Sequence, residues 1–249
     1  KMLFIKSYAE LKEKTKKSGN TYFVMRHGET NHNVGGRIST VVNNEDHLTE
    51  KGKEQVLASA KDLVAQHFDL IISSPFARTK ETAEIVAQTL GMPSEEIIFD
   101  DRLHEISVPM YEGRTWAEYH TDFPKTVENF DNAPEGNESY ADMKRRNMNL
   151  LFELEKTYTN KKILIITHGG PAWVLIAGSQ MLNIEETLNL IRNRAGYHFL
   201  NNAEVTQVPF VAFSHNANYE FDIHRPYIDE ITLVEGNEEY KRIPEVIAC

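Results

Sequence analysis

Two arginines and two histidines in this sequence stand just beyond short apolar runs. The runs cover residues 21–25, 69–73 and 163–167, and the residues that follow them are Arg26, His27, Arg78 and His168. A neutral imidazole can attack phosphorus through one ring nitrogen while a hydrogen bond to the other nitrogen fixes its tautomer. Arginine binds phosphate oxygens with two donors and keeps its charge. Phosphoryl transfer needs little beyond such positioning and charge stabilisation, so these four residues would suit it.

The elements around these residues predict how they could meet. Apolar strand-like runs alternate with segments of helical periodicity, such as the helix expected after Thr49 and the helix expected to stop at Gly91. This alternation predicts a mainly parallel sheet between helices, a three-layer α/β/α fold. Ligands bind such sheets at the carboxyl ends of the strands. The sequence therefore predicts one crevice that holds both arginines and both histidines.

Two further stretches complete the expected domain. A third strand is expected at 97–99, and Ser139 followed by Asp142 predicts the start of a helix that runs to about Tyr158. The stretch 107–137 is rich in Pro, Gly and Asn and is expected to be irregular. Its aromatic residues are interpreted as local core rather than as a lid over the substrate; they are Trp116, Tyr119 and Phe123.

The composition excludes several classes of protein. A hydrophobic share of 41% and a charged share of 26% over 249 residues are typical of a globular protein. The formal net charge of -10 argues against a nucleic-acid-binding surface. No apolar run approaches the roughly 18 residues that span a bilayer. The one cysteine, Cys249, excludes an intramolecular disulfide framework and a cysteine metal cluster, so a cytoplasmic protein is the simplest expectation.

Five segments resemble, in the same order, the motifs of the histidine phosphatase (phosphoglycerate mutase-like) superfamily. They are residues 26–37, 48–55, 73–83, 103–105 and 167–170. The resemblance runs from about Thr21 to about Val208. It implies the phosphoglycerate mutase-like fold and a phosphatase that forms a phosphohistidine. No metal ion and no cofactor are implied, because the arginines neutralise the phosphate charge.

The resemblance also implies a role for each site residue. His27 would be the nucleophile, and the phosphoryl group would be bound by Arg26, Arg78 and His168. Glu105 would protonate the leaving oxygen and then accept a proton from the hydrolytic water. A carboxyl beside a dianionic phosphate in a partly closed site is pushed towards its protonated form, which agrees with this role. Contacts to a small phosphorylated substrate are expected from Thr30, Asn33, Arg37 and Gly169.

The sequence departs from the family pattern at three places. Residues 39–44 replace the Gly and Trp that often precede an Asp in this family, and Pro109 stands where a Gly is usual. The arginine commonly found soon after Gly170 is absent, and Trp173 lies nearby instead. None of the three changes removes a catalytic group, and the first falls in the substrate-facing loop.

The two ends of the chain resemble a different family. Residues 5–19 and 222–233 are similar to the catalytic core of isoleucyl-tRNA synthetases, and residues 242–249 extend the match. The resemblance implies a phosphatase domain at 21–210, inserted between synthetase-like flanks at 1–20 and 211–249. The flanks contain no synthetase active-site motif. This chain is therefore not expected to aminoacylate or to bind nucleic acid directly, whereas tRNA is an expected partner of a full-length host.

Three functions stay open at the level of sequence. The first is a phosphatase, which is favoured because the segment between Glu105 and His168 is too short for the large insertion of true phosphoglycerate mutases. The second is a mutase-type isomerase that would retain the phosphohistidine. The third is a catalytically silent insert in the synthetase. The physiological substrate and the oligomeric state cannot be read from the residues.

Overall fold

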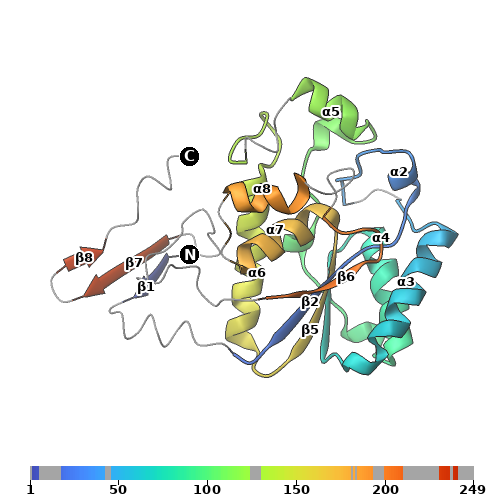
Figure 1. Ribbon diagram of the computed structural model, residues 1–249, viewed down its shortest axis with the longest axis horizontal. Coiled ribbons are helices and arrows are strands. Elements are labelled where there is room, and N and C mark those ends of the chain that lie inside the picture. Colours follow the sequence, from blue (N-terminus) through green and yellow to red (C-terminus); the bar gives the residue numbers. More distant parts are fainter. Residues whose placement is uncertain are drawn as a thin grey trace.

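The computed structural model describes residues 2–5, 18–42, 46–123, 130–180, 182, 184–192, 199–209, 230–235 and 238–240. A five-stranded sheet with the strand order β4-β3-β5-β2-β6 lies at the centre of the larger body (Figure 1). Its strands are β2 (Thr21–Arg26), β3 (Leu70–Ser73), β4 (Ile98–Phe99), β5 (Lys162–Thr167) and β6 (Val205–Val208). The first four pair in parallel, and β6 pairs antiparallel with β2. The predicted, mainly parallel sheet is confirmed.

Helices cover both faces of this sheet. One face carries α3 (Glu50–Leu63) and α4 (Ala77–Leu90). The other carries α6 (Tyr140–Thr157), α7 (Gly169–Ser179) and α8 (Ile184–Arg192). The three-layer α/β/α prediction is therefore confirmed.

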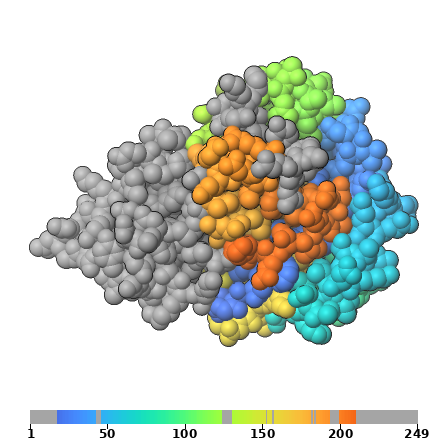
Figure 2. Space-filling view, in the orientation of Figure 1, coloured from blue at the N-terminus to red at the C-terminus, as the bar shows by residue number. Residues whose placement is uncertain are grey.

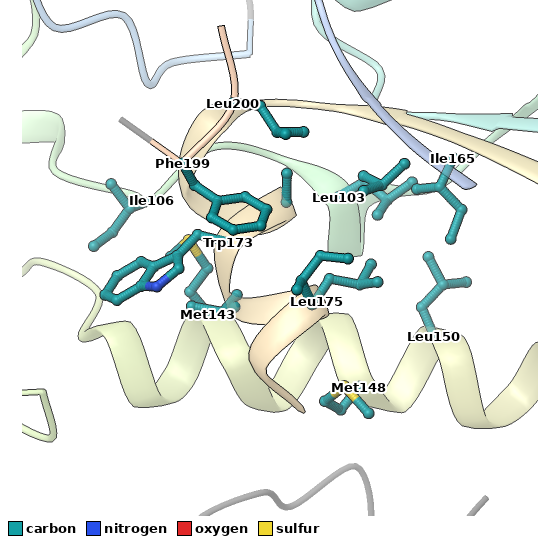
Figure 3. Close-up of a cluster of buried hydrophobic side chains, with 14 of the residues drawn as sticks. Leu103, Ile106, Met143, Met148, Leu150, Ile165, Trp173, Leu175, Phe199 and Leu200 are labelled. Atoms are coloured by element: carbon teal, nitrogen blue, oxygen red, sulfur yellow. The ribbon is translucent and has the colours of Figure 1, made fainter. Parts of the chain in front are cut away.

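The alternation of side chains along β5 explains the two layers of core. Ile163 and Ile165 pack with α6, α7 and α8, whereas Leu164 and Ile166 pack with α3 and α4. Figure 3 shows Ile165 facing Leu150 of α6. Each fully buried aliphatic side chain contributes about 1.5–3 kcal/mol to folding. A strand that is apolar on both faces is thus held between two helical layers.

The helix ends follow the expected local signals. The hydroxyl of Thr49 accepts a hydrogen bond from the backbone N–H of Gly52 at 2.9 Å and caps α3. Gly91 ends α4 in the left-handed region at a φ of 71°, where glycine carries no steric penalty. Ser139 and Asp142 form a capping box at the start of α6. These three predicted boundaries are confirmed.

The segment 107–137 is more ordered than expected. Its described part contains a short 3-10 helix, η4 (Pro109–Tyr111), and α5 (Trp116–Asp122). Thr115 and Glu118 form a capping box that starts α5, and the Tyr119 ring lies 5.0 Å from the Tyr111 ring. Tyr119 is only 2% exposed, so the aromatic cluster is local core, as interpreted from the sequence. Residues 124–129 lie outside the described part.

Short elements lie at the end of the sheet where the strands finish. α2 (Asn31–Val34) follows β2 there, and Figure 1 shows it at the same end as α5. A bridge between Arg37 and Thr115 joins the two segments. Elsewhere the chain forms the 3-10 helices η1 (Val64–Gln66), η2 (Ser94–Glu96) and η3 (Asp101–Leu103).

The two ends of the described chain form a separate small sheet. Its strands are β1 (Met2–Ile5), β7 (Glu230–Glu235) and β8 (Glu238–Tyr240). β1 pairs in parallel with β7, and β8 pairs antiparallel with β7. Most of the synthetase-like matches, including 222–229 and 242–249, lie outside the described residues.

The surface of the larger body shows β6 as an edge strand. In Figure 2 the residues around β6, in orange, lie beside the start of β2 in blue and α3 in cyan. Within the described ranges, every helix is too short or too polar to cross a bilayer.

Candidate active site

The ends of three neighbouring strands bring the predicted residues together. In the parallel register, Arg26 of β2 pairs with Thr167 of β5, and Ser73 of β3 pairs with Ile166. The backbone N–H of His27 donates to the Thr167 carbonyl at 3.0 Å, which continues the ladder by one residue. His27, Ser74 and His168 therefore follow adjacent strands at one edge of the sheet. α4 and α7 begin just after this edge, so the positive ends of both helix dipoles lie there.

His27 is held in one tautomer, with its nucleophilic nitrogen unprotonated and facing Arg78. Its Nδ1 lies 2.7 Å from the Gly28 carbonyl oxygen, which can only accept, so Nδ1 carries the proton. Its Nε2 accepts a hydrogen bond from Nε of Arg78 at 3.2 Å. The side chain is buried, with the residue 2% exposed. The Nε2 lone pair therefore faces the guanidinium group that would bind the phosphoryl oxygens.

Arg78 lies at the centre of the polar cluster. Besides His27, it donates from Nη2 to Nδ1 of His168 at 3.0 Å and to the Ser39 carbonyl at 2.8 Å. Its Nη1 donates to the Ser39 hydroxyl at 2.8 Å and lies 3.4 Å from Oδ2 of Asp46. Arg78 and Asp46 are both almost fully buried. The guanidinium plane is thus fixed before any substrate binds.

His168 faces His27 from the neighbouring strand end. The centres of the two rings are 5.3 Å apart. Because Arg78 donates to its Nδ1, the Nε2 of His168 carries the proton and donates to the Ser74 hydroxyl at 2.8 Å. Both imidazoles are therefore positioned by hydrogen bonds on each ring nitrogen.

The charge of this site is carried by the arginines. Burial, followed by the charges of Arg78 and Arg26, lowers the pKa of His27 well below 6.5. Burial and Arg78 lower the pKa of His168 in the same way. Burial lowers the pKa of Arg78 to about 10, and Asp46 and Glu105 oppose that effect. At neutral pH both histidines are neutral and Arg78 is charged, the state that nucleophilic attack on a phosphate requires.

These lowered pKa values predict that the fold loses stability in mild acid. The unfolded chain protonates His27 and His168 near pH 6.5, whereas the folded chain does not. The free energy of unfolding is therefore highest above pH 6.5. It decreases as the pH falls below 6.5, by up to about 1.4 kcal/mol per pH unit for each histidine. Urea denaturation at a series of pH values between about 5 and 7 measures this slope. A His168→Asn variant should show a shallower slope, and an unchanged slope would contradict the assignment.

Arg26 and the start of α7 complete the anion-binding side of the site. Arg26 donates from Nη1 to the Leu200 carbonyl at 2.8 Å. Its Nε is buried and has no partner among the described residues. Gly169, the first residue of α7, lies beside it, and a Cβ on Gly169 would be 3.6 Å from that Nε. A buried donor without an acceptor costs free energy, so this Nε is available to an anion.

Glu105 reaches the same place from the segment after η3. Its Oε1 accepts from the N–H of Ile106 at 2.9 Å. A Cβ added to Gly170 would lie 2.5 Å from this Oε1, so the carboxylate lies close to the backbone at the start of α7. Glu105 interacts electrostatically with both Arg26 and Arg78. The structure thus brings all five predicted catalytic residues to one edge of the sheet.

The residues expected to contact the substrate have different environments. Thr30 is fully buried, and its hydroxyl accepts from the N–H of Asn33 at 3.2 Å as the cap of α2. A substrate contact by Thr30 stays a prediction. The Asn33 side chain completes the capping box by accepting from the Thr30 N–H. Arg37 is exposed and donates from Nη1 to the Gly113 carbonyl at 2.8 Å. Substrate contacts by Asn33, Arg37 and Gly169 stay predictions.

Three residues of the site were missed by the sequence analysis. Ser39 and Asp46 bind the Arg78 guanidinium, and Asn202 donates from Nδ2 to the His27 carbonyl at 3.2 Å and to Oδ1 of Asn33 at 2.9 Å. Asp46 lies just ahead of the motif at 48–55, and a buried arginine needs an acidic partner, so a search for one could have found it. No local pattern marks Ser39 or Asn202.

Within the described part of the chain, no group of three or more His, Cys, Asp or Glu side chains is arranged to hold a metal ion. Of the acidic side chains near the site, Glu105 and Glu112 accept from the backbone N–H groups of Ile106 and Thr40. Asp46 lies 2.8 Å from Nδ1 of His32 as well as beside Arg78.

Comparison with known proteins shows the same fold and motifs. Residues 22–208 match the histidine phosphatase superfamily (branch 1). Phosphoserine phosphatase 1 of Hydrogenobacter thermophilus is 30% identical over 153 residues, which cover 59% of this chain and 70% of that protein. The metal-independent phosphoserine phosphatase of Arabidopsis thaliana is 31% identical over 154 residues, which cover 59% of this chain and 63% of that protein. The native structure of a mycobacterial glucosyl-3-phosphoglycerate phosphatase superimposes with a TM-score of 0.64 at 28% identity, covering 75% of this chain and 88% of that one.

Proposed function

Because this chain belongs to branch 1 of the histidine phosphatase superfamily and is a phosphatase, we propose that it hydrolyses phosphate monoesters through a phosphohistidine on His27, without a metal ion. The observation that carries the proposal is the environment of His27. Its Nδ1–H is held by the Gly28 carbonyl, and its Nε2 lone pair faces a buried arginine. The lowered pKa keeps this nitrogen unprotonated at neutral pH.

The reaction follows in two displacements. In the first, Nε2 of His27 bonds to phosphorus as the bond to the ester oxygen breaks, and Glu105 gives its proton to that oxygen. In the second, a water molecule attacks phosphorus, Glu105 takes a proton from it, and the bond to Nε2 breaks to release inorganic phosphate. Arg26 and Arg78 stabilise the charge on the phosphoryl oxygens in both steps. His168 lines the same space and is bound to Arg78.

The acid role of Glu105 predicts a dependence on the leaving group. Glu105→Gln cannot donate a proton, so hydrolysis of phosphoserine, whose alkoxide leaves poorly, should fall by about 10²–10⁴-fold. Hydrolysis of para-nitrophenyl phosphate should fall much less, because nitrophenolate leaves without protonation. Steady-state kinetics on the two esters measure the difference. Glu50→Gln, an exposed residue paired with Lys53, is the matched control and should leave both rates unchanged. Equal losses on the two esters in Glu105→Gln would contradict the acid role.

The substrate is proposed to be a small phosphorylated metabolite. The relatives named above act, by their names, on phosphoserine and on a glucosylated phosphoglycerate, and both are esters of alkyl alcohols. Such esters need a proton donor for the leaving oxygen, which is the role proposed for Glu105. Phosphoserine and phosphoglycerate esters are therefore the first substrates to test. Two of the three departures from the family pattern lie at residues 39–44 and at Pro109, and Ser39 of the first binds Arg78.

The insertion in an isoleucyl-tRNA synthetase is proposed as the context of this domain, with the phosphatase at 21–210. Two observations support it. β2 and β6, which begin and end the domain, are antiparallel neighbours with Tyr22 opposite Val208, so the chain enters and leaves at one place. β1 and β7, from the two flanks, pair in parallel with each other. Sequencing the whole gene tests the proposal, because both flanks should continue as synthetase in one reading frame. A cytoplasmic location stays a prediction.

A further inference from the structure

The segment that carries Glu105 has no regular structure of its own. Residues 104–108 follow η3 and belong to neither a helix nor a strand. On one side the hydroxyl of Thr167 donates to the Leu103 carbonyl at 2.6 Å and ties the segment to the end of β5. Beyond that point, side chains from elsewhere must fix the backbone if the carboxylate is to have one position.

Arg146 of α6 binds this backbone on both sides of His104. Its Nη1 donates to the Arg102 carbonyl at 2.6 Å, and its Nη2 donates to the Glu105 carbonyl at 3.2 Å. A guanidinium group offers several donors in one rigid plane, so it can hold two carbonyls at a fixed separation. A flexible ammonium group could not do so in the same way.

Glu138 orients Arg146 and also binds the backbone of Ser107. Together the two side chains, Arg146 and Glu138, are called the clamp below. Its carboxylate accepts from Nε and Nη2 of Arg146 at 2.6 and 2.9 Å. It also accepts from the backbone N–H of Ser107 at 3.0 Å, and the Glu138 N–H donates to the Ser107 carbonyl at 2.8 Å. The two side chains are only 14% and 13% exposed. Such a largely buried, two-bond pair is rigid, unlike an exposed ion pair.

The carboxylate of Glu105 depends on this rigidity. Its Oε1 lies beside the start of α7, 2.5 Å from the position that a Cβ on Gly170 would take. A small movement of the Glu105 backbone would therefore move the carboxyl away from the edge of the sheet where His27 lies. The hydrogen bonds of Arg146 go to Glu138 and to the backbone carbonyls of residues 102 and 105, and its charge also lowers the pKa of His168.

We infer that Arg146 and Glu138 are positioning residues that hold the proton donor Glu105 in place, an inference that rests on the proposed function of Glu105. They bind the backbone at residues 102, 105 and 107 and so fix the donor relative to the leaving oxygen. Losing the clamp should slow only the step that needs proton transfer. A merely structural role would instead lower the stability of the protein and slow all substrates alike.

The test compares two esters in Arg146→Met. Hydrolysis of phosphoserine should fall by about 10–100-fold, the loss expected when a catalytic group is displaced by about 1 Å. Hydrolysis of para-nitrophenyl phosphate should change by less than about threefold. Arg145→Met is the matched control, because Arg145 lies next to Arg146 on α6 and also pairs with an acidic residue, Asp142, but both of these side chains are exposed. Both rates should stay near those of the wild type in this control.

A double variant separates positioning from other effects. In the Glu105→Gln background, Arg146→Met should cause no further loss on phosphoserine, because the proton donor is already gone. An additive loss there, or equal slowing of both esters in Arg146→Met alone, overturns the inference while leaving the proposed function intact. No turnover of either ester by the wild type overturns both. If Arg146→Met fails to fold, Glu138→Gln retains an acceptor for Ser107 and should show the same selective loss.

Discussion

Replacing His27 with alanine should reduce the hydrolysis of para-nitrophenyl phosphate by on the order of 10⁴-fold or more. The good leaving group makes this ester independent of Glu105, so the loss reports the nucleophile alone. In the wild type, Nε2 of His27 is unprotonated and lies 3.2 Å from Nε of Arg78, which also donates to Nδ1 of His168 at 3.2 Å. The rate should be measured with a chelator present, because the proposed reaction uses no metal ion.

The fold of His27→Ala should survive. The imidazole is neutral and its main bonds are to Gly28 and Arg78, so its removal leaves no unpaired charge. His47→Ala is the matched control, because His47 is exposed and pairs with Glu81 at the surface. That control should keep full activity. Turnover in His27→Ala that equals the wild type, or wild-type activity that disappears with chelator, would refute a phosphohistidine mechanism.

Arg78→Met should cause the second largest loss of phosphatase activity. Arg78 is the buried charge next to both histidines, and loss of one preorganised donor to a developing anion costs about 10²–10³-fold in kcat. Methionine has a similar length and fills the space without strain. The loss should therefore appear on phosphoserine and on para-nitrophenyl phosphate alike, in contrast to the loss from Glu105→Gln.

The same change should also destabilise the protein. Asp46 is 2% exposed, and removal of Arg78 takes the guanidinium group away from its buried carboxylate. Breaking a buried ion pair from one side costs about 3 kcal/mol, measurable by urea denaturation. The double variant Arg78→Met with Asp46→Asn should be more stable than Arg78→Met but equally inactive. Recovery of activity in the double variant would show that Arg78 acts only on stability.

The fold could be predicted because its signals are local. The apolar run of β5 needed helices on both faces, and Thr49, Gly91 and Ser139 marked helix ends by their own chemistry. α5 was missed because its start depends on a capping box within a stretch whose Pro, Gly and Asn content suggests a loop. In this stretch the capping box of Thr115 and Glu118 starts a helix in spite of the loop-like composition.

The residues of the candidate site also divide into those that could be predicted from the sequence and those that could not. Residues placed at strand ends could be predicted to meet, since parallel strands finish at one edge. Ser39 and Asn202 could not, because their partners come from segments that are distant in sequence, and only the folded chain brings them together. Arg146 belongs to this second group, as its acceptors precede it by some 40 residues.

The strand order of the central sheet has a consequence for synthesis of the protein on the ribosome. β2, which leads into His27, lies between β5 and β6, and both of these are made long after it. β3, α4 and β4 can associate early, because they follow one another closely in the chain. Both edges of β2 therefore stay unpaired until residues 162–208 have emerged from the ribosome. Such non-local pairing is slow, and it leaves exposed strands open to aggregation. A chain halted before β5 would therefore hold the nucleophile but no site, and would need a chaperone.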